Sequence, residues 1–208
     1  MLDLILPLQC GGCGAPATRW CPECDDGLTV KPDEPHLVTP RLDPGVPVLS
    51  LGRYAGPRRK AIVAVKEHGR TDLIHPLACA LRDGLEHLLT WGIVEAPCTV
   101  VPAPTKRTSA RKRGGDPVTR IARLATTATD LHVVDALRLT AFARDSVGLS
   151  SADRQRNITG RVRSVAAVTG PVLLVDDVVT TGATAAESVR VLQTRAAHVV
   201  AVLALANA

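Results

Sequence analysis

The chain has 208 residues, of which 46% are hydrophobic and 22% charged, with a formal net charge of +5. These values are ordinary for a globular protein and exclude a wholly disordered, fibrous or membrane-embedded chain. The aromatic residues are few, namely Trp20, Tyr54, Trp91 and Phe142, so a binding site here must rely more on charge, backbone and aliphatic groups than on rings.

The start of the chain is apolar but lacks the basic segment and small-residue cleavage site of a signal peptide. The longest clearly apolar stretch, residues 199–206, is far shorter than the roughly 20 residues of a membrane helix. We therefore expect a cytoplasmic protein without a membrane span.

Near the N-terminus, the cysteines follow a C-x2-C-x7-C-x2-C pattern, made by Cys10, Cys13, Cys21 and Cys24. Two such pairs let four thiolates converge on one tetrahedral zinc ion. Four reduced thiols or two disulfides are the alternatives, and a cytosolic setting disfavours the disulfides. Because all four ligands would be protein thiolates, we expect a structural site rather than a catalytic one. Two further cysteines, Cys79 and Cys98, are expected in the core.

The first half of the remaining chain predicts three elements. The proline-rich residues 25–52 predict an extended arm, acidic at its start. Leucines recur at helical spacing in residues 75–91, which indicates an amphipathic helix. A short apolar run at 98–101 ends at Pro102, as a buried strand would.

The second half alternates between strand and helix patterns. Proline at a first turn, followed by apolar residues at helical spacing, predicts a helix over 117–129. Residues 140–160 are polar and basic without a sustained period, which predicts a long mobile loop, and loops of that length are usually functional or disordered. The other predicted elements are strands at 132–137, 172–175 and 198–205 and a helix at 185–195. This alternation predicts an α/β fold, with a parallel sheet covered by helices on both faces.

The strongest local signal is the run VLLVDDVVTTGAT at 172–184. A buried strand would end where Asp176 and Asp177 begin, and ligands bind outside the carboxyl ends of parallel strands. The small, hydroxyl-rich turn that follows consists of Thr180, Thr181, Gly182, Ala183 and Thr184. It would open a helix whose N-terminus favours a phosphate, with Gly182 allowing close approach. The two acids suit sugar hydroxyls or Mg²⁺, so the run predicts a phosphorylated-sugar site, and a structural strand end with a threonine cap is the alternative.

This run resembles, at every position, the 5-phosphoribosyl-1-pyrophosphate (PRPP) motif of type I phosphoribosyltransferases. Nearly the whole chain is similar to the ComF family, zinc-ribbon phosphoribosyltransferase-like proteins named for DNA-uptake competence. The similarity rests on the order of the cysteine quartet, a Tyr54…Lys66-x-x-Gly69 stretch, VVPAP at 100–104 followed by Arg113-Gly114, Arg154-x-Arg156-Asn157 and the PRPP-like run. The family usually has Arg-Gly-Phe-Asn where this chain has RGGD at 113–116.

The resemblance implies a domain organisation and a set of site residues. Residues 1–52 would form a zinc-binding knuckle and arm, and 53–208 a type I phosphoribosyltransferase-like domain. Asp176 and Asp177 would be the catalytic pair on the ribose, beside the PRPP-binding turn at 180–184. Pyrophosphate would lie in the loop of Ala103, Pro104, Thr105, Lys106 and Arg107, and further loop cations would be Lys66, Arg113, Arg154 and Arg156.

The implied reaction displaces pyrophosphate from C1 of the ribose by a nitrogen nucleophile, with Mg²⁺ and cationic side chains stabilising the leaving group. Enzymes of the 6-oxopurine subgroup usually carry Asp where this chain has Thr180, which disfavours hypoxanthine and guanine as acceptors. Residues 1–52, the zinc-binding knuckle and the arm together, are the candidate hood over the acceptor, and a homodimer remains open.

Basic residues are concentrated in residues 53–70, 103–123 and 138–163, which hold 19 of the 25 Lys and Arg but 4 of the 20 Asp and Glu. The net charge of +5 thus combines +15 on these segments with −10 elsewhere, which predicts an anion-binding face. The alternative function is a non-catalytic module on the same fold that binds single-stranded DNA or a nucleotide signal, although the shortage of aromatic rings counts against stacking.

Overall fold

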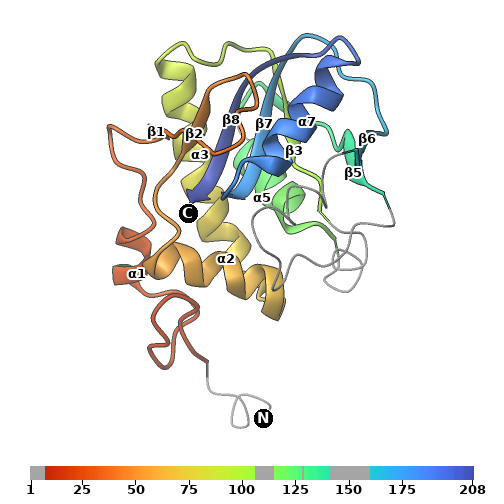
Figure 1. Ribbon diagram of the computed structural model, residues 1–208. Helices are drawn as coiled ribbons and strands as arrows, with labels where there is room; N and C mark the ends of the chain where they lie inside the picture. The colour runs from red at the N-terminus through yellow and green to blue at the C-terminus, as the bar shows by residue number, and fades with distance from the viewer. Residues whose placement is uncertain (1–7, 106–114, 128, 141–159) are drawn as a thin grey trace.

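The computed structural model describes residues 8–105, 115–127, 129–140 and 160–208 (Figure 1). The main sheet has the strand order β1-β2-β8-β7-β3-β4. Its strands are β1 (His36–Leu37), β2 (Val48–Ser50), β3 (Cys98–Pro102), β4 (Leu131–Val133), β7 (Pro171–Val179) and β8 (His198–Asn207). The β1–β2 pair is antiparallel, whereas the pairs from β2 through β4 are parallel. The predicted α/β fold is confirmed, with a mixed, mostly parallel sheet.

Helices cover both faces of this sheet, as predicted. Figure 1 shows α7 (Ala183–Gln193) in front of the sheet and α3 (Ile74–Thr90) and α5 (Pro117–Ala125) behind it. Side chains along β7 alternate between the two apolar cores, because successive residues of a strand point to opposite faces. Leu173 and Val175 join the core with α3 and α5, and Val172 and Leu174 join the core with α7.

Two further α-helices and a second, two-stranded sheet belong to the described chain. Helix α1 (Pro22–Asp26) contains Cys24, the last of the four cysteines, and α2 (Gly56–His68) runs beneath the sheet in Figure 1. The strands β5 (Leu137–Leu139) and β6 (Val162–Ser164) form a separate antiparallel pair beside α7. In the part of the chain that the structure describes, we find no helix long and apolar enough to cross a membrane.

Several predicted boundaries differ from the observed ones. The helix predicted at 117–129 ends at Ala125, and residues 132–137 divide between β4 and β5 instead of forming one strand. The sequence pattern did not predict α2 because its buried residues, such as Ala61 and Ile62, lie among basic ones. Cys98 is buried as expected, but Cys79 is partly exposed and lies 3.8 Å from His75 Nδ1.

The predicted arm at 25–52 contributes to the sheet itself. Strand β2 pairs in parallel with β8, with Val48 opposite Val202, and β1 extends the sheet as an antiparallel edge. A local sequence pattern cannot show this pairing, because β2 is three residues long and its partner lies near the other end of the chain.

Candidate functional site

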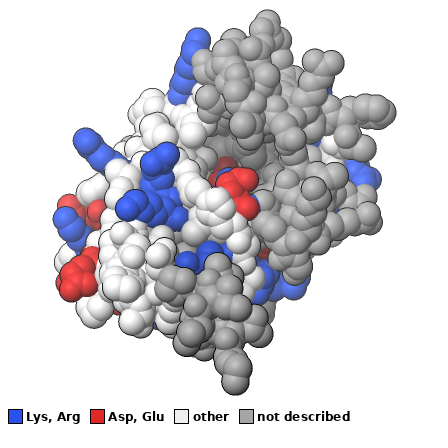
Figure 2. Space-filling model, turned by 90° about the horizontal axis from the view of Figure 1, so that it is seen from below, with Lys and Arg blue, Asp and Glu red and all other residues white. Residues whose placement is uncertain are grey.

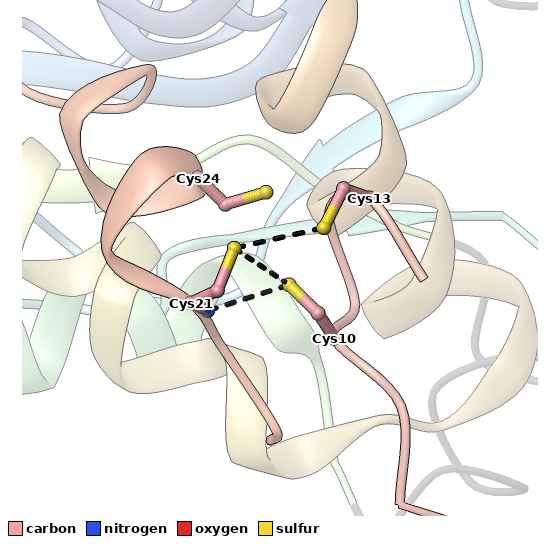
Figure 3. Close-up of side chains that lie close together, drawn as sticks. All are labelled: Cys10, Cys13, Cys21 and Cys24. Atoms are coloured by element: carbon pink, nitrogen blue, oxygen red, sulfur yellow. Dashed lines mark hydrogen bonds between the residues drawn. The ribbon is translucent and has the colours of Figure 1, made fainter. Parts of the chain in front are cut away.

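The four cysteines predicted to bind zinc lie together, with their sulfur atoms turned toward one another (Figure 3). All four Sγ atoms are within 4.8 Å of one another, and Cys21 Sγ lies 3.6 Å from the Sγ atoms of both Cys10 and Cys13. Tetrahedral zinc with Zn–S bonds near 2.3 Å places sulfurs about 3.8 Å apart. The geometry of this cysteine cluster is therefore compatible with a structural zinc ion.

Backbone N–H groups turn inward on the same sulfurs. The N–H groups of Gly12 and Cys21 donate to Cys10 Sγ, each at 3.4 Å. Burial acts against ionisation of Cys10, but these contacts and one from the Cys13 backbone outweigh it and lower the pKa of Cys10 from 9.0 to about 6. Zinc binds the thiolate, so the chain prepares at least one ligand for a cation.

The cysteine cluster is attached to the rest of the fold through backbone contacts. Arg70 Nη2 donates to the carbonyl oxygens of Gln9 and Arg19 at 3.2 and 3.3 Å, and it forms an ion pair with Asp72. A Cβ on Gly11 would lie 2.3 Å from Leu73 Cδ1, so the glycine lets the cluster pack closely against the start of α3.

The predicted ribose acids lie within β7 rather than after it. The strand continues past the predicted end at 175, with Asp176 opposite Ala204 and Val179 opposite Asn207. Both acids are buried, Asp176 at 8% and Asp177 at 7% exposure. Figure 2 views the side toward which β8 ends and shows acidic side chains in a hollow, with Lys and Arg side chains nearby.

Lys66 brings a cation to this pair. Its Nζ lies 2.6 Å from Asp177 Oδ2, and it comes from α2, whose N-terminal part is held near the end of β8. Burial opposes the charge on Lys66, but the Asp177 carboxylate and, to a smaller extent, Asp176 raise the pKa of Lys66 overall. The predicted cation and the predicted acids therefore meet in one network.

Asp176 is the most perturbed acid of this network. Burial and the neighbouring Asp177 carboxylate raise its pKa from 3.8 to about 7, against the opposing effect of Lys66. Its Oδ1 accepts a hydrogen bond of 2.8 Å from the Asp177 N–H. The pair thus combines one carboxylate held by Lys66 with a second acid that takes up a proton near neutral pH.

Asp116 interacts electrostatically with Asp176 and Asp177. It was not predicted as a site residue. It caps α5, where its Oδ1 accepts from Val118 N–H at 3.2 Å and its Oδ2 from the Thr119 hydroxyl at 3.1 Å. Burial raises its pKa, and Asp177 adds to that shift, while a hydrogen bond from Thr105 opposes it. An Asp followed by Pro is a helix-start signal that could have placed it at this edge of the sheet.

The predicted PRPP-binding turn lies between β7 and α7. The Thr181 hydroxyl accepts from Ala183 N–H at 3.4 Å, and Gly182 has a φ of +81°, which favours glycine. We predicted that Gly182 lets a phosphate approach the backbone closely. In the structure it is the arm that approaches Gly182, since a Cβ added there would lie 2.5 Å from the Leu42 carbonyl oxygen. Leu42 N–H also donates to the Thr181 carbonyl at 2.9 Å. Thr180 is exposed and Thr184 half-buried, so both hydroxyls lie near the surface.

The predicted pyrophosphate loop is described only in part. Ala103 and Pro104 are buried, and Ala103 N–H donates to the Val175 carbonyl at 2.7 Å, which ties the loop to β7. Thr105 reaches Asp116 with its side chain. The remaining predicted cations lie outside the described residues, namely Lys106, Arg107, Arg113, Arg154 and Arg156.

Among the described residues of the predicted basic segments, several arginines bind other groups of the fold. Arg58 is buried and donates to the carbonyls of Leu28 and Leu205, each at 3.2 Å. Arg70 and Arg138 form ion pairs with acids close to them in the chain. Exposed basic residues of these segments include Arg53, Arg59, Lys60, Arg120, Arg123 and Arg163.

No protein-family model matches the chain, and a search of curated proteins finds no match.

Proposed function

We propose that the chain is a phosphoribosyltransferase that binds PRPP at the carboxyl end of β7 and transfers phosphoribose to a nitrogen acceptor with loss of pyrophosphate. The observation that carries this proposal is the buried Asp176–Asp177 pair, held by Lys66 immediately before the turn that opens α7. A ComF-type assignment and a type I phosphoribosyltransferase fold are parts of the same proposal, and they rest on the order of the motifs.

The acids and the turn suit the two ends of a ribose phosphate. Lys66 holds Asp177 in a defined place, and a carboxylate accepts hydrogen bonds from sugar hydroxyls. The first N–H groups of α7 have no partner within the helix and lie at the positive end of its dipole, which favours the phosphate. The acids would therefore fix the ribose and the turn would fix its phosphate.

Pyrophosphate would leave on the side of β3. The loop that begins at Ala103 is hydrogen-bonded to β7, which places its backbone beside the acids. In the reaction, the bond from C1 to the pyrophosphate oxygen breaks with its electron pair going to pyrophosphate. The acceptor nitrogen forms the new bond to C1 and loses its proton to water. Because negative charge builds on the leaving group, cationic groups aimed at it would accelerate this step.

We infer that the cysteine cluster binds one structural zinc ion, which would hold residues 8–28 together. Elsewhere in the described ranges, no Asp, Glu, His or Cys side chains form a comparable cluster. We assign no step to Mg²⁺.

Isothermal titration calorimetry with PRPP and MgCl₂ tests the function. The wild type should bind, and Asp176→Asn should weaken binding at least tenfold, since it replaces a ribose-contacting acid by an amide. Asp130→Asn is the matched control, because Asp130 is an exposed acid at the opposite end of the sheet. No binding of PRPP by the wild type would remove this proposal.

The same experiment distinguishes the alternative module. An oligothymidylate that binds equally to wild type and Asp176→Asn, is not displaced by PRPP and loses affinity steeply with salt would favour single-stranded DNA as the ligand.

A further inference from the structure

Asp116 connects the start of α5 to the loop that follows β3. Its Oδ1 accepts a hydrogen bond of 3.2 Å from Val118 N–H, and its Oδ2 accepts one of 3.1 Å from the Thr119 hydroxyl. The Thr105 side chain also hydrogen-bonds to this carboxyl group. A helix cap needs only the bond from the backbone N–H, so the bond to Thr105 gives Asp116 a second task, outside its own helix.

The described part of the loop after β3 is thereby held at both of its ends. At the first end, Ala103 N–H donates to the Val175 carbonyl at 2.7 Å, and Val175 directly precedes Asp176. At the second end, Asp116 binds the Thr105 side chain. Between them lies Pro104, which is buried and has a φ fixed by its ring. Residues 103–105 therefore have little freedom to move relative to β7 and α5.

This anchored loop lies close to the acids of β7. Asp116 raises the pKa of Asp176, and Asp177 in turn raises the pKa of Asp116, so the three carboxyl groups are near enough to interact. In the proposed function, Asp176 and Asp177 contact the ribose of PRPP. The pyrophosphate is attached to C1 of that ribose, which brings it to the neighbourhood of the loop.

Asp116 itself is poorly suited to contact pyrophosphate. An ionised carboxylate has the same sign of charge as the ligand and repels it. Its oxygens also accept three hydrogen bonds within the fold, from Val118, Thr119 and Thr105. Any effect of Asp116 on pyrophosphate must therefore act through Thr105 and the loop.

We propose that Asp116 is a positioning residue for the pyrophosphate of PRPP, and that it acts by holding the Thr105 side chain and thus the loop that begins at Ala103. A loop that is already fixed loses less conformational freedom when the ligand binds, and it presents its backbone to the ligand in one arrangement. The inference rests on the proposed function, because it concerns the pyrophosphate half of the same site.

Two ligands separate this role from general stability. PRPP and ribose 5-phosphate differ by the pyrophosphate group, so the ratio of their affinities reports on the loop, and isothermal titration calorimetry with MgCl₂ on the full chain measures both. Thr105→Val removes the hydroxyl and leaves the cap of α5 unchanged. Asp116→Ser keeps a capping residue, but its single oxygen cannot serve both Val118 N–H and Thr105. Each variant should weaken PRPP binding about tenfold and leave ribose 5-phosphate binding unchanged.

Three further variants make the assignment specific. Asp116→Asn keeps an oxygen for Val118 N–H, and its NH₂ group can donate to a threonine hydroxyl, so it should preserve the ratio. Thr119→Val is the matched control, because it removes the other hydroxyl bound to the same carboxyl group and should also preserve the ratio. The double variant of Asp116→Ser with Thr105→Val should lose no more PRPP affinity than either single variant, since both break one contact.

The results that overturn the inference differ from those that overturn the function. If ribose 5-phosphate and PRPP bind but the ratio is unchanged in Asp116→Ser or in Thr105→Val, the site stands and the positioning role is wrong. Additive losses in the double variant, or a loss in Asp116→Asn equal to that in Asp116→Ser, would also overturn it. If Asp116→Ser fails to fold, as judged by circular dichroism, Thr105→Val compared with Thr119→Val decides. If the wild type binds neither ligand, the proposed function itself fails.

Discussion

The cysteine cluster and the acids of β7 are both groups of anionic or ionisable side chains, but they are assembled in different ways. Residues 10–24 supply every member of the cysteine cluster, whereas the acids and their cation come from β7, α5 and α2. The first group converges on a centre the size of one ion. The second has one lysine among three carboxyl groups.

This difference indicates what each group can do. A closed set of four thiolates leaves no position for a substrate, so a metal bound there stabilises the fold. A set with more carboxyl groups than cations retains capacity for hydrogen bonds to an added ligand. The comparison can be tested by changing one member of each group and measuring the stability and metal content of the chain.

Loss of the cysteine cluster should have the largest effect on the stability and metal content of the chain. We expect one zinc ion per purified chain by plasma mass spectrometry, and none in Cys24→Ser, since Cys24 is buried against the other ligands. Structural zinc sites contribute on the order of 10 kcal/mol to folding, so the N-terminal segment should become sensitive to protease. Cys79→Ser removes a cysteine outside the cluster and should keep the metal. A zinc-free wild type with a protected N-terminal segment would contradict this.

The raised pKa of Asp176 should make stability depend on pH. Between its unfolded value of 3.8 and about 7, the folded state binds the proton and the unfolded state does not. Stability should therefore fall as pH rises through this range and then level off. Because a shift of one pKa unit corresponds to about 1.4 kcal/mol, Asp176→Asn should be more stable than wild type at pH 8 by on the order of 3 kcal/mol.

Urea unfolding of both proteins at pH 4 and pH 8 measures this difference. The amide oxygen of the Asn variant can still accept the Asp177 N–H bond, so the comparison isolates the charge. Equal pH profiles for the two proteins would show that Asp176 ionises normally.

Removing the cation of the acid network should destabilise the fold less. Lys66→Met leaves Asp177 without its ion pair, which costs about 3–5 kcal/mol when both partners are buried. Because the Lys66 side chain is 36% exposed, solvent screens the remaining charge and we expect a loss of about 2 kcal/mol. Lys60→Met on the exposed side of α2 should change stability by less than about 0.5 kcal/mol. The double variant with Asp177→Asn should recover part of the loss.

Loss of the contact between the arm and the turn before α7 should have the smallest effect on the stability of the fold. Gly182→Ala combines a positive φ with a clash against Leu42, whereas Gly170→Ala has a similar φ of +78° and nothing within 4 Å of its Cβ. Each should lose about 1 kcal/mol from backbone strain, and the extra loss in Gly182→Ala measures the arm contact. Equal melting temperatures for the two variants would mean that the arm moves aside at no cost.

The parts of the molecule predicted from sequence are those whose signal is local. Cysteine spacing predicts the cluster, and apolar periodicity predicts α3, β3 and β8. The end of β7 was wrong because two adjacent acids normally stop a buried strand. Here Lys66 neutralises Asp177, and Asp176 takes up a proton readily, so the strand continues between its neighbours.

Other parts depend on contacts between distant residues, which no local pattern contains. Lys66 was predicted as a loop cation, but its contact with Asp177 requires the packing of α2 beneath the sheet. The hydrogen bond from the Tyr54 N–H to the Asn207 carbonyl also joins residues that are distant in the sequence. The pairing of β2 with β8 likewise joins two segments that are distant in the sequence.

That pairing has a consequence for the order in which the molecule forms. During synthesis the cysteine segment emerges early and has all its ligands at once, whereas β2 meets its partner only after β8 has left the ribosome. Contacts between residues so far apart in sequence form slowly, because the entropy of closing the intervening chain is lost first. Until then Leu42 and the turn at Thr181 are apart, so the candidate active site is one of the last regions of the nascent protein to be completed.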